Sequence, residues 1–362
     1  MGGVATAFEA LAAELESAGH EVGVLVPYAE DVDSLAIDKR HIVGYAWRRR
    51  CRSRIVKRML NAFNIWTGWV FYFALIKKIP HDVFCLFLPT PDYQWARYVK
   101  NPKICWLHAL APKPRNDFTG RMWRREIKRD LDRFGTLAAV SPAVANSWQS
   151  AYGLVRMPQV VGNLIDCGRI RRLGATKKWP LKNSTRKRIV CVGRVSHEKG
   201  QRRLIEAVAG LENIEVVFVG DGADRERCEM MAKELGLSGR ICFVGSRDNP
   251  YSFVAAADLT VVPSYEEGFG LVAIESLILG TPVLATDCGG TRFALAEGRY
   301  GMLVENSVEG LKNGICAWLA DPSSVIPSCG FSSAVAEIES ADRSLRNTLR
   351  GIFAQFQLAS NN

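Results

Sequence analysis

The sequence predicts an α/β protein built of two Rossmann-like, doubly wound parallel-sheet domains that face a cleft. The chain has 362 residues, which exceeds the roughly 250 to 300 residues at which a single hydrophobic core stops growing. Apolar residues make up 48% and charged residues 23%, so disordered, collagen-like and disulfide-scaffold classes are excluded. Short apolar runs alternate with helical patterns, which is typical of parallel sheets covered on both faces.

The first half of the chain begins with a helical pattern over residues 6–18, which ends at Gly19 and is followed by a short apolar strand over residues 21–26. Further strand-like runs recur over residues 83–88, 104–107, 137–140 and 159–161. The polar, basic stretch 171–188 has the composition of a linker. We therefore place the first domain at residues 1–180.

The second half alternates more regularly. The predicted strands cover residues 188–192, 215–219, 241–244, 259–262 and 282–285, and the predicted helices between them cover residues 200–209, 224–235, 250–256 and 270–279. This pattern defines a second domain over residues 181–330. Residues 331–362 are expected to form a C-terminal helix that packs back on the N-terminal domain.

The ten cysteines are scattered singly without a Cys-x-x-Cys pair, which favours a reducing cytoplasm. The first residues form an amphipathic pattern with Glu9, Glu14 and Glu16, which is no signal peptide. We therefore expect a cytoplasmic protein.

A turn between the predicted strand 259–262 and the next helix carries the strongest chemical signal. Backbone N–H groups near Gly268 to Leu271 would point out of a helix N-terminus, which is a ready anion site. Glu267 precedes this helix, and Glu275 lies about two turns further on. The alternative is that Glu267 is an acid near the N-cap that the helix dipole favours, and that Glu275 is a solvated helix residue.

A second signal follows the first strand of the second domain. Arg194 and Lys199 come directly after residues 188–192, and ligands of open α/β sheets bind at the carboxyl ends of strands. A guanidinium and an ammonium together suit a diphosphate. The alternative is a solvated surface pair beside Glu198.

These motifs, in this order and spacing, resemble the retaining glycosyltransferases of family 4, the glycosyl transferases group 1, which have the two-domain GT-B fold. The similar stretch runs from about residue 188 to 305, and its motifs are Gly193-Arg194, Glu198-Lys199-Gly200, Gly220-Asp221-Gly222, Val244-Gly245, Glu267-Gly268-Phe269-Gly270 and Gly280-Thr281-Pro282. The resemblance implies that the second domain binds a nucleotide diphosphate sugar, with the base near Val244 and Gly245.

The resemblance also assigns roles within this donor site. It implies that Arg194 and Lys199 hold the diphosphate and that Glu275 binds the ribose hydroxyls. It further implies that Glu267 and the backbone of Gly268, Phe269, Gly270 and Leu271 address the sugar and the phosphates.

The first domain is similar to the family over fewer motifs and would bind the acceptor. Gly2-Gly3 resembles the family's glycine loop, which makes Gly3 a donor-binding candidate, and His108 is similar to the histidine that faces the transferred sugar. The alternative for His108 is a structural role. Ala109 and Phe293 stand where the family often has acids, and Leu164 replaces a glycine in the turn at residues 162–166.

The family's first strand is expected before Gly2-Gly3, but Met1 stands there. Without this central strand, neighbouring strands would have unpaired N–H and C=O groups. We therefore expect that the coding frame extends upstream, or that the chain is a truncated paralogue.

The activity that the resemblance implies is transfer of a hexose-type sugar with retention, to a lipid-linked or polysaccharide acceptor in cell-envelope glycan synthesis. Glu267, His108, Arg194 and Lys199 would be catalytic, and neither a metal nor a cofactor is expected. Two alternatives are a GT-B-fold nucleotide-sugar epimerase and an inactive paralogue that acts as a membrane-associated binding protein.

The net charge of +10 comes from one segment, because residues 39–81 hold eleven basic and no acidic residues. Within it, the stretch from Arg48 to Lys78 combines clustered cations with aromatic residues, which suits the surface of an anionic membrane. The alternatives are a transmembrane span and a buried helix. The nearly neutral remainder of the chain argues against nucleic-acid binding. We expect peripheral attachment to the inner face of the cytoplasmic membrane.

Overall fold

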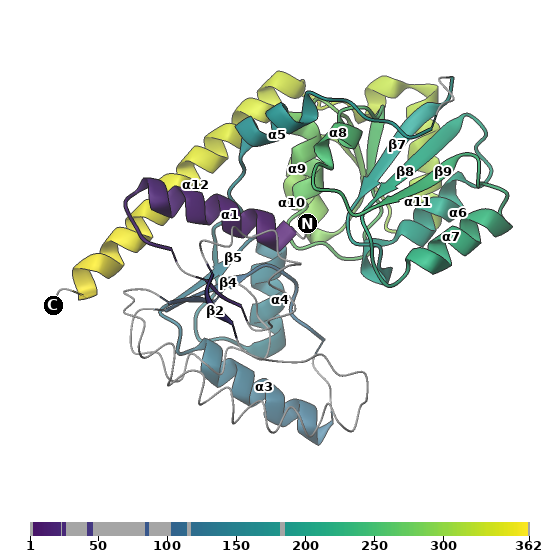
Figure 1. Cartoon of the computed structure of the whole chain (residues 1–362). Coiled ribbons are helices and arrows are strands. Elements are labelled where there is room, and N and C mark those ends of the chain that lie inside the picture. Colours follow the sequence, from purple (N-terminus) through teal and green to yellow (C-terminus); the bar gives the residue numbers. More distant parts are fainter. Residues whose placement is uncertain are drawn as a thin grey trace.

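The computed structural model describes residues 3–22, 24–26, 42–45, 84–86, 103–113, 117–181 and 185–360. The predicted membrane segment from Arg48 to Lys78 lies outside the described residues, as does Gly2 of the predicted glycine loop. Within the described residues the chain forms two α/β domains that are connected by two helices, which lie on the same side of the molecule (Figure 1). Every pair of neighbouring strands in the sheets of these domains is parallel, which confirms the predicted fold class.

The C-terminal domain contains a six-stranded sheet in the order β12-β11-β10-β7-β8-β9. Its strands are β7 (Lys187–Val192), β8 (Ile214–Val219), β9 (Ile241–Gly245), β10 (Leu259–Val262), β11 (Val283–Thr286) and β12 (Met302–Val304). Every residue of β8, β10 and β11 is buried, as expected for strands covered on both faces. The chain builds the sheet outward from β7 to β9, then returns to β10 on the other side of β7 and continues outward to β12. The strand order therefore reverses between β7 and β10, and such a switch point is where open α/β sheets bind ligands.

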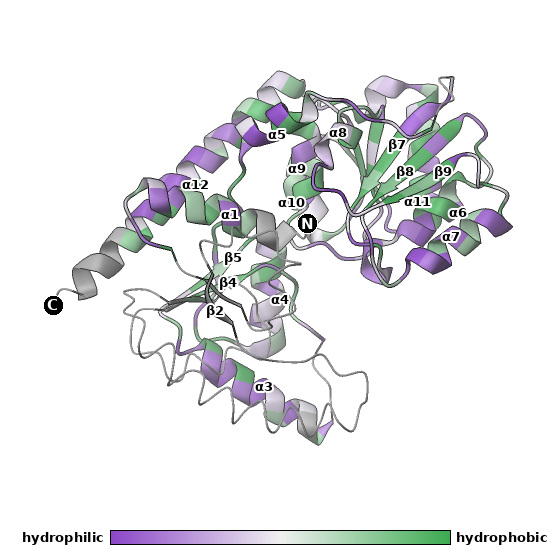
Figure 2. Ribbon diagram, viewed as in Figure 1, coloured by the Kyte–Doolittle hydropathy of each residue, from purple (hydrophilic) through white to green (hydrophobic). Residues whose placement is uncertain are grey.

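Helices cover both faces of this sheet. One face packs on α6 (Gln201–Val208), α7 (Arg225–Glu234) and α11 (Val308–Ala320), through a core that includes Leu204, Cys228 and Trp318. The other face packs on α8 (Tyr251–Val254) and α9 (Leu271–Ile278). Shorter elements are α10 (Gly289–Ala294), η5 (His197–Lys199), η6 (Ala296–Gly298) and η7 (Pro322–Val325). Figure 2 shows apolar strands within polar outer helix surfaces, which is the pattern that drives this layering.

The N-terminal domain has two parallel sheets among the described residues. One pairs β1 (Val24–Val26) with β2 (Ile42–Tyr45), and the other has the order β3-β4-β5-β6, with β3 (Phe84–Leu86), β4 (Lys103–Leu107), β5 (Thr136–Ala139) and β6 (Gln159–Val160). The helices are α1 (Gly3–Ser17), α3 (Phe118–Leu131) and α4 (Pro142–Tyr152). Their core includes Leu11, Trp106, Leu131 and Trp148.

Two helices connect the domains. The predicted linker 171–188 begins inside α5 (Cys167–Gly174), so its first four residues are helical and pack near α8 and α9. The helix starts at this point because the Asp166 side chain accepts a hydrogen bond from the backbone N–H of Arg169, which caps its N-terminus. Residues 171–174 have the polar composition of a linker because they include the basic side chains Arg171 and Arg172 at the end of the helix.

Helix α12 (Phe331–Ser360) is 30 residues long and runs from the C-terminal domain to lie along α1 (Figure 1). Glu14 of α1 is only 5% exposed and forms ion pairs with Arg346 and, at 2.7 Å, Arg350. Burial raises the pKa of Glu14, but the hydrogen bonds from the two guanidinium groups outweigh it, and the pKa lies below its usual value. This cluster fastens α12 to the N-terminal domain.

Among the residues that the structure describes, no helix is both long and apolar enough to cross a membrane.

Candidate functional site

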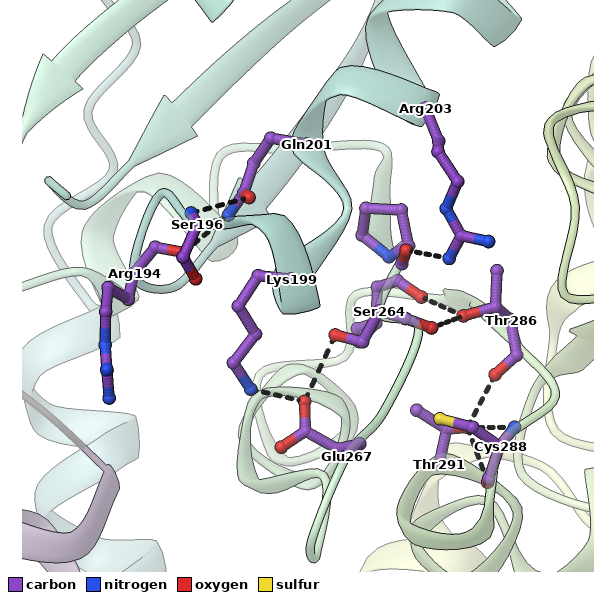
Figure 3. Close-up of polar contacts among 12 residues, drawn as sticks. Arg194, Ser196, Lys199, Gln201, Arg203, Ser264, Glu267, Thr286, Cys288 and Thr291 are labelled. Carbon is purple, nitrogen blue, oxygen red and sulfur yellow. Dashed lines mark hydrogen bonds and ion pairs between the residues drawn. The ribbon is translucent and has the colours of Figure 1, made fainter. Parts of the chain in front are cut away.

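The loops that follow β7 and β10 meet at one edge of the sheet (Figure 3). Lys199, at the end of η5, lies with its Nζ 2.7 Å from Oε2 of Glu267. The hydroxyl of Ser264 donates a second hydrogen bond, of 3.2 Å, to the same oxygen. The structure therefore brings together two predicted site residues that are 68 positions apart, with opposite charges balanced at the sheet edge.

Arg194 lies on the same side of the site but does not join this pair. Its side chain is exposed and extends beside Lys199 in Figure 3. Its backbone carbonyl accepts a 2.8 Å hydrogen bond from the Gln201 side chain, which fixes the start of the loop. The guanidinium is thus available to an anion that approaches Lys199.

The predicted base site lies at the end of β9. Val244 is half-buried, and Gly245, with φ of 75°, is buried and accepts a 2.9 Å hydrogen bond from the backbone of Gly220. A Cβ on Gly220 would lie 1.9 Å from the carbonyl oxygen of Gly193, so the strand ends touch backbone to backbone. Only glycine allows this close approach.

The N-terminus of α9 follows Gly270, which has a φ of 87°. A side chain at this position would be strained, and its Cβ would lie 2.9 Å from the Cβ of Ala294. Glycine has no side-chain oxygen to cap the helix, and the first backbone hydrogen bond of the helix is donated by Ala273 to the Gly270 carbonyl. The N–H groups of Leu271 and Val272, which precede it, can therefore bind an external acceptor. This arrangement suits a phosphate oxygen.

Glu275, on α9, is half-buried and therefore is not the solvated helix residue of the alternative interpretation. The Tyr251 hydroxyl donates a 3.1 Å hydrogen bond to its Oε1. Burial raises the pKa of Glu275 to about 7, although Tyr251 and Arg169 act in the opposite direction. The two predicted glutamates thus have separate partners, Lys199 for Glu267 and Tyr251 for Glu275.

His108 follows β4 in the other domain and reaches the same edge. Its ring stacks on Trp106 with 5.9 Å between centroids. Burial lowers the pKa of His108 to about 3, so the imidazole is neutral at physiological pH. A Cβ on Gly268 would lie 2.4 Å from the His108 carbonyl oxygen, so the two domains touch at this point.

The side chain of Phe269 is buried, with 7% of its surface exposed, so this residue faces the site with its backbone. Its ring contacts the ring of Phe293, with 5.7 Å between the centroids. Phe293 occupies the position at which the family often has an acid. Leu164, another of the three departures from the family pattern, is 3% exposed and belongs to the same core as Phe269. Phe293 and Leu164 therefore add apolar contacts in and around the core that contains Phe269.

The structure gives roles to three residues for which the sequence predicted none, although Ser264 lies within the predicted motif. Ser264 and Tyr251 hold the two glutamates, and Ser141 donates a 2.6 Å hydrogen bond to the carbonyl of Gly268. The Ser-Pro pair at 141–142 is a helix-start signal, but it does not announce this long-range contact. Gly3 begins α1.

Within the described part of the chain, no group of three or more His, Cys, Asp or Glu residues could hold a metal ion.

Comparisons with known proteins agree with this architecture. In solved structures, the chain resembles Anabaena Alr3699/HepE in complex with UDP and glucose, with a TM-score of 0.73, 19% identity and coverage of 98% of this chain and 96% of that one. It also resembles the apo form of the lipopolysaccharide outer core galactosyltransferase WaaB, with a TM-score of 0.64, 16% identity and coverage of 98% and 96%. Fold and site thus define a two-domain protein of the GT-B class.

Sequence comparison identifies the family. Residues 175–327 match glycosyl transferases group 1, and residues 1–169 match glycosyltransferase family 4. The chain belongs to this glycosyltransferase family.

Two curated relatives match over shorter segments. The lipopolysaccharide core biosynthesis glycosyltransferase LpsE of Rhizobium meliloti (strain 1021) is 37% identical over 136 residues, which cover 37% of this chain and 40% of that protein. The D-inositol 3-phosphate glycosyltransferase of Corynebacterium glutamicum (strain R) is 42% identical over 130 residues, which cover 32% and 31%. The matched part thus spans well under two thirds of either relative.

Proposed function

We propose that the protein is a retaining glycosyltransferase that moves a hexose-type sugar from a nucleotide diphosphate sugar to a lipid-linked or polysaccharide acceptor of the cell envelope. The observation that carries this proposal is the convergence of Lys199, Glu267 and the α9 N-terminus on the loop that touches the His108 backbone. UDP is the first donor nucleotide to test, because HepE was solved with UDP and with UDP-glucose. LpsE supports an acceptor in lipopolysaccharide synthesis.

In this proposal, the diphosphate takes the place of Glu267 as the partner of Lys199. The bond between the anomeric carbon and the diphosphate oxygen breaks while the acceptor oxygen attacks from the same face, and the acceptor proton leaves with the diphosphate. Lys199, Arg194 and the N–H groups of α9 would stabilise the negative charge that develops on the leaving group. Glu267, released from Lys199, would bind the sugar.

His108 would contact the transferred sugar as a neutral imidazole. Its lowered pKa supports this, because a neutral ring can accept a hydrogen bond from a sugar hydroxyl through one nitrogen and donate through the other. Glu275 would receive the ribose hydroxyls beside Tyr251. No step in this scheme requires a metal ion, so chelation should leave the activity unchanged.

The test is an incubation of the purified protein with a panel of nucleotide sugars and a lipid extract. Transfer of labelled sugar to lipid supports the proposal, whereas isomerised donor would indicate an epimerase, and neither product would indicate a binding protein. Lys199→Ala should abolish most of the transfer, and Lys233→Ala, on the exposed side of α7, is the matched control.

Peripheral attachment to the inner face of the cytoplasmic membrane is part of the same proposal. Within the described residues, α3 supports it, because Phe118 is 71%, Met122 52% and Trp123 45% exposed beside exposed Arg124 and Arg125. Exposed apolar and aromatic side chains among cations suit the interface of an anionic bilayer. All nine cysteines that the structure describes are free, in keeping with a cytoplasmic location.

The predicted basic segment is the second element of this attachment. Vesicle sedimentation tests it: replacing Arg48, Arg49, Arg50 and Arg52 with Gln should weaken binding to anionic vesicles, and salt should release the wild-type protein. Equal binding to neutral vesicles, or resistance to salt, would contradict peripheral attachment.

A further inference from the structure

Ser141 is a buried hydroxyl that contacts both domains. It is the N-cap residue of α4, and its Oγ accepts a 3.2 Å hydrogen bond from the backbone N–H of Val144. The same hydroxyl donates a 2.6 Å hydrogen bond to the carbonyl of Gly268, 127 positions away in the donor loop. Ser141 is 0% exposed. Its single proton is therefore directed to the other domain, while its lone pair caps its own helix.

Around this hydrogen bond, the domains approach without room for side chains. A Cβ on Gly268 would lie 2.4 Å from the carbonyl oxygen of His108, and one on Gly289 would lie 2.2 Å from the Cβ of Ala143. Behind the loop, a Cβ on Gly290 would lie 2.4 Å from the carbonyl oxygen of Glu267. The donor loop is thus held between α10 on one side and the N-terminal domain on the other.

Helix α4 also holds the segment that carries His108. The indole N–H of Trp148 donates a 2.8 Å hydrogen bond to the carbonyl of Ala109. The hydroxyl of Ser147 accepts a 3.0 Å hydrogen bond from the N–H of Ala111. One rigid helix therefore fixes the His108 segment through its side chains and the donor loop through its N-cap.

We propose that Ser141 is a positioning residue that latches the two domains in the arrangement that the structure shows, which is called closed below. When the domains meet, its hydroxyl fixes the Gly268 carbonyl, so that the donor loop faces the His108 segment in one register. The latch itself rests only on contacts within the chain, and its effect on turnover rests on the proposed function. The competing explanation is that Ser141 only caps α4.

Three substitutions separate the latch from the cap. Ser141→Ala removes both, and Ser141→Thr keeps a hydroxyl for both. Ser141→Asp keeps a strong N-cap acceptor, but an ionised carboxylate cannot donate to the Gly268 carbonyl and repels it. The latch therefore predicts that Asp behaves like Ala, whereas a cap alone predicts that Asp behaves like Ser.

The first readout is small-angle X-ray scattering of the full-length protein without ligand. The loss of one hydrogen bond should lower the ratio of closed to open molecules about tenfold. We expect a larger radius of gyration for Ser141→Ala and Ser141→Asp, and a wild-type value for Ser141→Thr. A wild-type radius for Ser141→Asp would overturn the proposal.

The second readout is the split between binding and turnover. UDP binding measured by calorimetry should stay within about twofold in Ser141→Asp, because the nucleotide contacts lie in the other domain, while kcat should fall about tenfold. Unchanged kcat in Ser141→Asp would overturn the role in turnover. If the wild-type protein transfers no sugar, the proposed function fails, and the scattering result still decides whether the latch exists.

Gly268→Ala provides a test that leaves the α4 cap intact. The added Cβ would meet the His108 carbonyl, so this variant should also have a larger radius of gyration. Gly239→Ala is the matched control, because a Cβ there meets nothing within 4 Å. If Ser141→Asp does not fold, Gly268→Ala decides: a compact Gly268→Ala protein would overturn the closed contact on which the latch depends.

Discussion

Glu275 should make nucleotide binding depend on pH in a way that its amide variant does not. Burial raises the pKa of this carboxyl to about 7, from an ordinary value of 4.5. Roughly one molecule in ten is then ionised at pH 6 and nine in ten at pH 8. Because ribose hydroxyls donate hydrogen bonds to the ionised form, Glu275 alone should raise the affinity for UDP about tenfold between these pH values.

The assay is isothermal titration calorimetry with UDP at pH 6, 7 and 8, on the wild type, Glu275→Gln and the exposed control Glu309→Gln. The phosphates of UDP also titrate in this range, but equally for all three proteins. The ratio of wild-type to Glu275→Gln affinity should therefore rise about tenfold from pH 6 to pH 8. A ratio that does not change with pH would refute the assignment of Glu275 to the ribose.

Folding stability should show the opposite sign. The folded protein holds a proton on Glu275 up to about pH 7, whereas the unfolded chain releases it near 4.5, so the folded state binds more protons between these values. The free energy of unfolding contributed by this residue therefore falls as the pH rises through this window. Urea titrations of the wild type and Glu275→Gln at pH 5 and pH 8 measure the difference, and a contribution that grows with pH would contradict the assigned pKa direction.

Three further predictions follow from charged side chains. Lys199→Ala should weaken UDP binding about ten- to a hundredfold, because a charge-assisted hydrogen bond is worth about 1.5 to 3 kcal/mol; unchanged affinity in calorimetry would exclude a diphosphate contact. Glu14→Gln should lower the free energy of unfolding by about 2 kcal/mol at pH 7. Because the folded-state pKa of Glu14 is lowered, this stabilisation is present above the ordinary value of 4.5 and is lost as the pH falls through the folded value; urea titrations that give the same difference at pH 7 and pH 2.5 would contradict it. Replacing Arg124 and Arg125 of α3 with Gln should weaken sedimentation with anionic vesicles at low salt, and wild-type binding would exclude α3 from the membrane surface.

The strand-and-helix alternation predicted the C-terminal sheet well, because its strands are buried on both faces and read as continuous apolar runs. The predicted strand 215–219 corresponds to β8, Ile214–Val219, in which every residue is buried. The predicted helix 250–256 is shorter, since α8 covers only Tyr251–Val254. Periodicity fixes such elements to within a few residues.

The pairing of side chains between elements is harder to read from the sequence. The rule that ligands bind at the carboxyl ends of strands placed Lys199 and Glu267 at one sheet edge, but their ion pair depends on rotamers set by the tertiary structure. Glu275 lies one helical turn from both Leu271 and Ile278 on α9, so its position in an apolar stripe was a usable sign of burial. Arg346 pairs with a glutamate 332 positions away, a contact that no local pattern announces.

A crystal structure of the protein with UDP would test most directly whether these residues form the donor site. We expect the diphosphate to lie against Lys199 and Arg194 with a phosphate at the N-terminus of α9, and Glu275 to accept hydrogen bonds from the ribose hydroxyls. The Lys199–Glu267 ion pair, 2.7 Å long without ligand, should be broken in the complex. A nucleotide bound elsewhere, or a diphosphate in place with this ion pair intact, would contradict the assignment of the donor site.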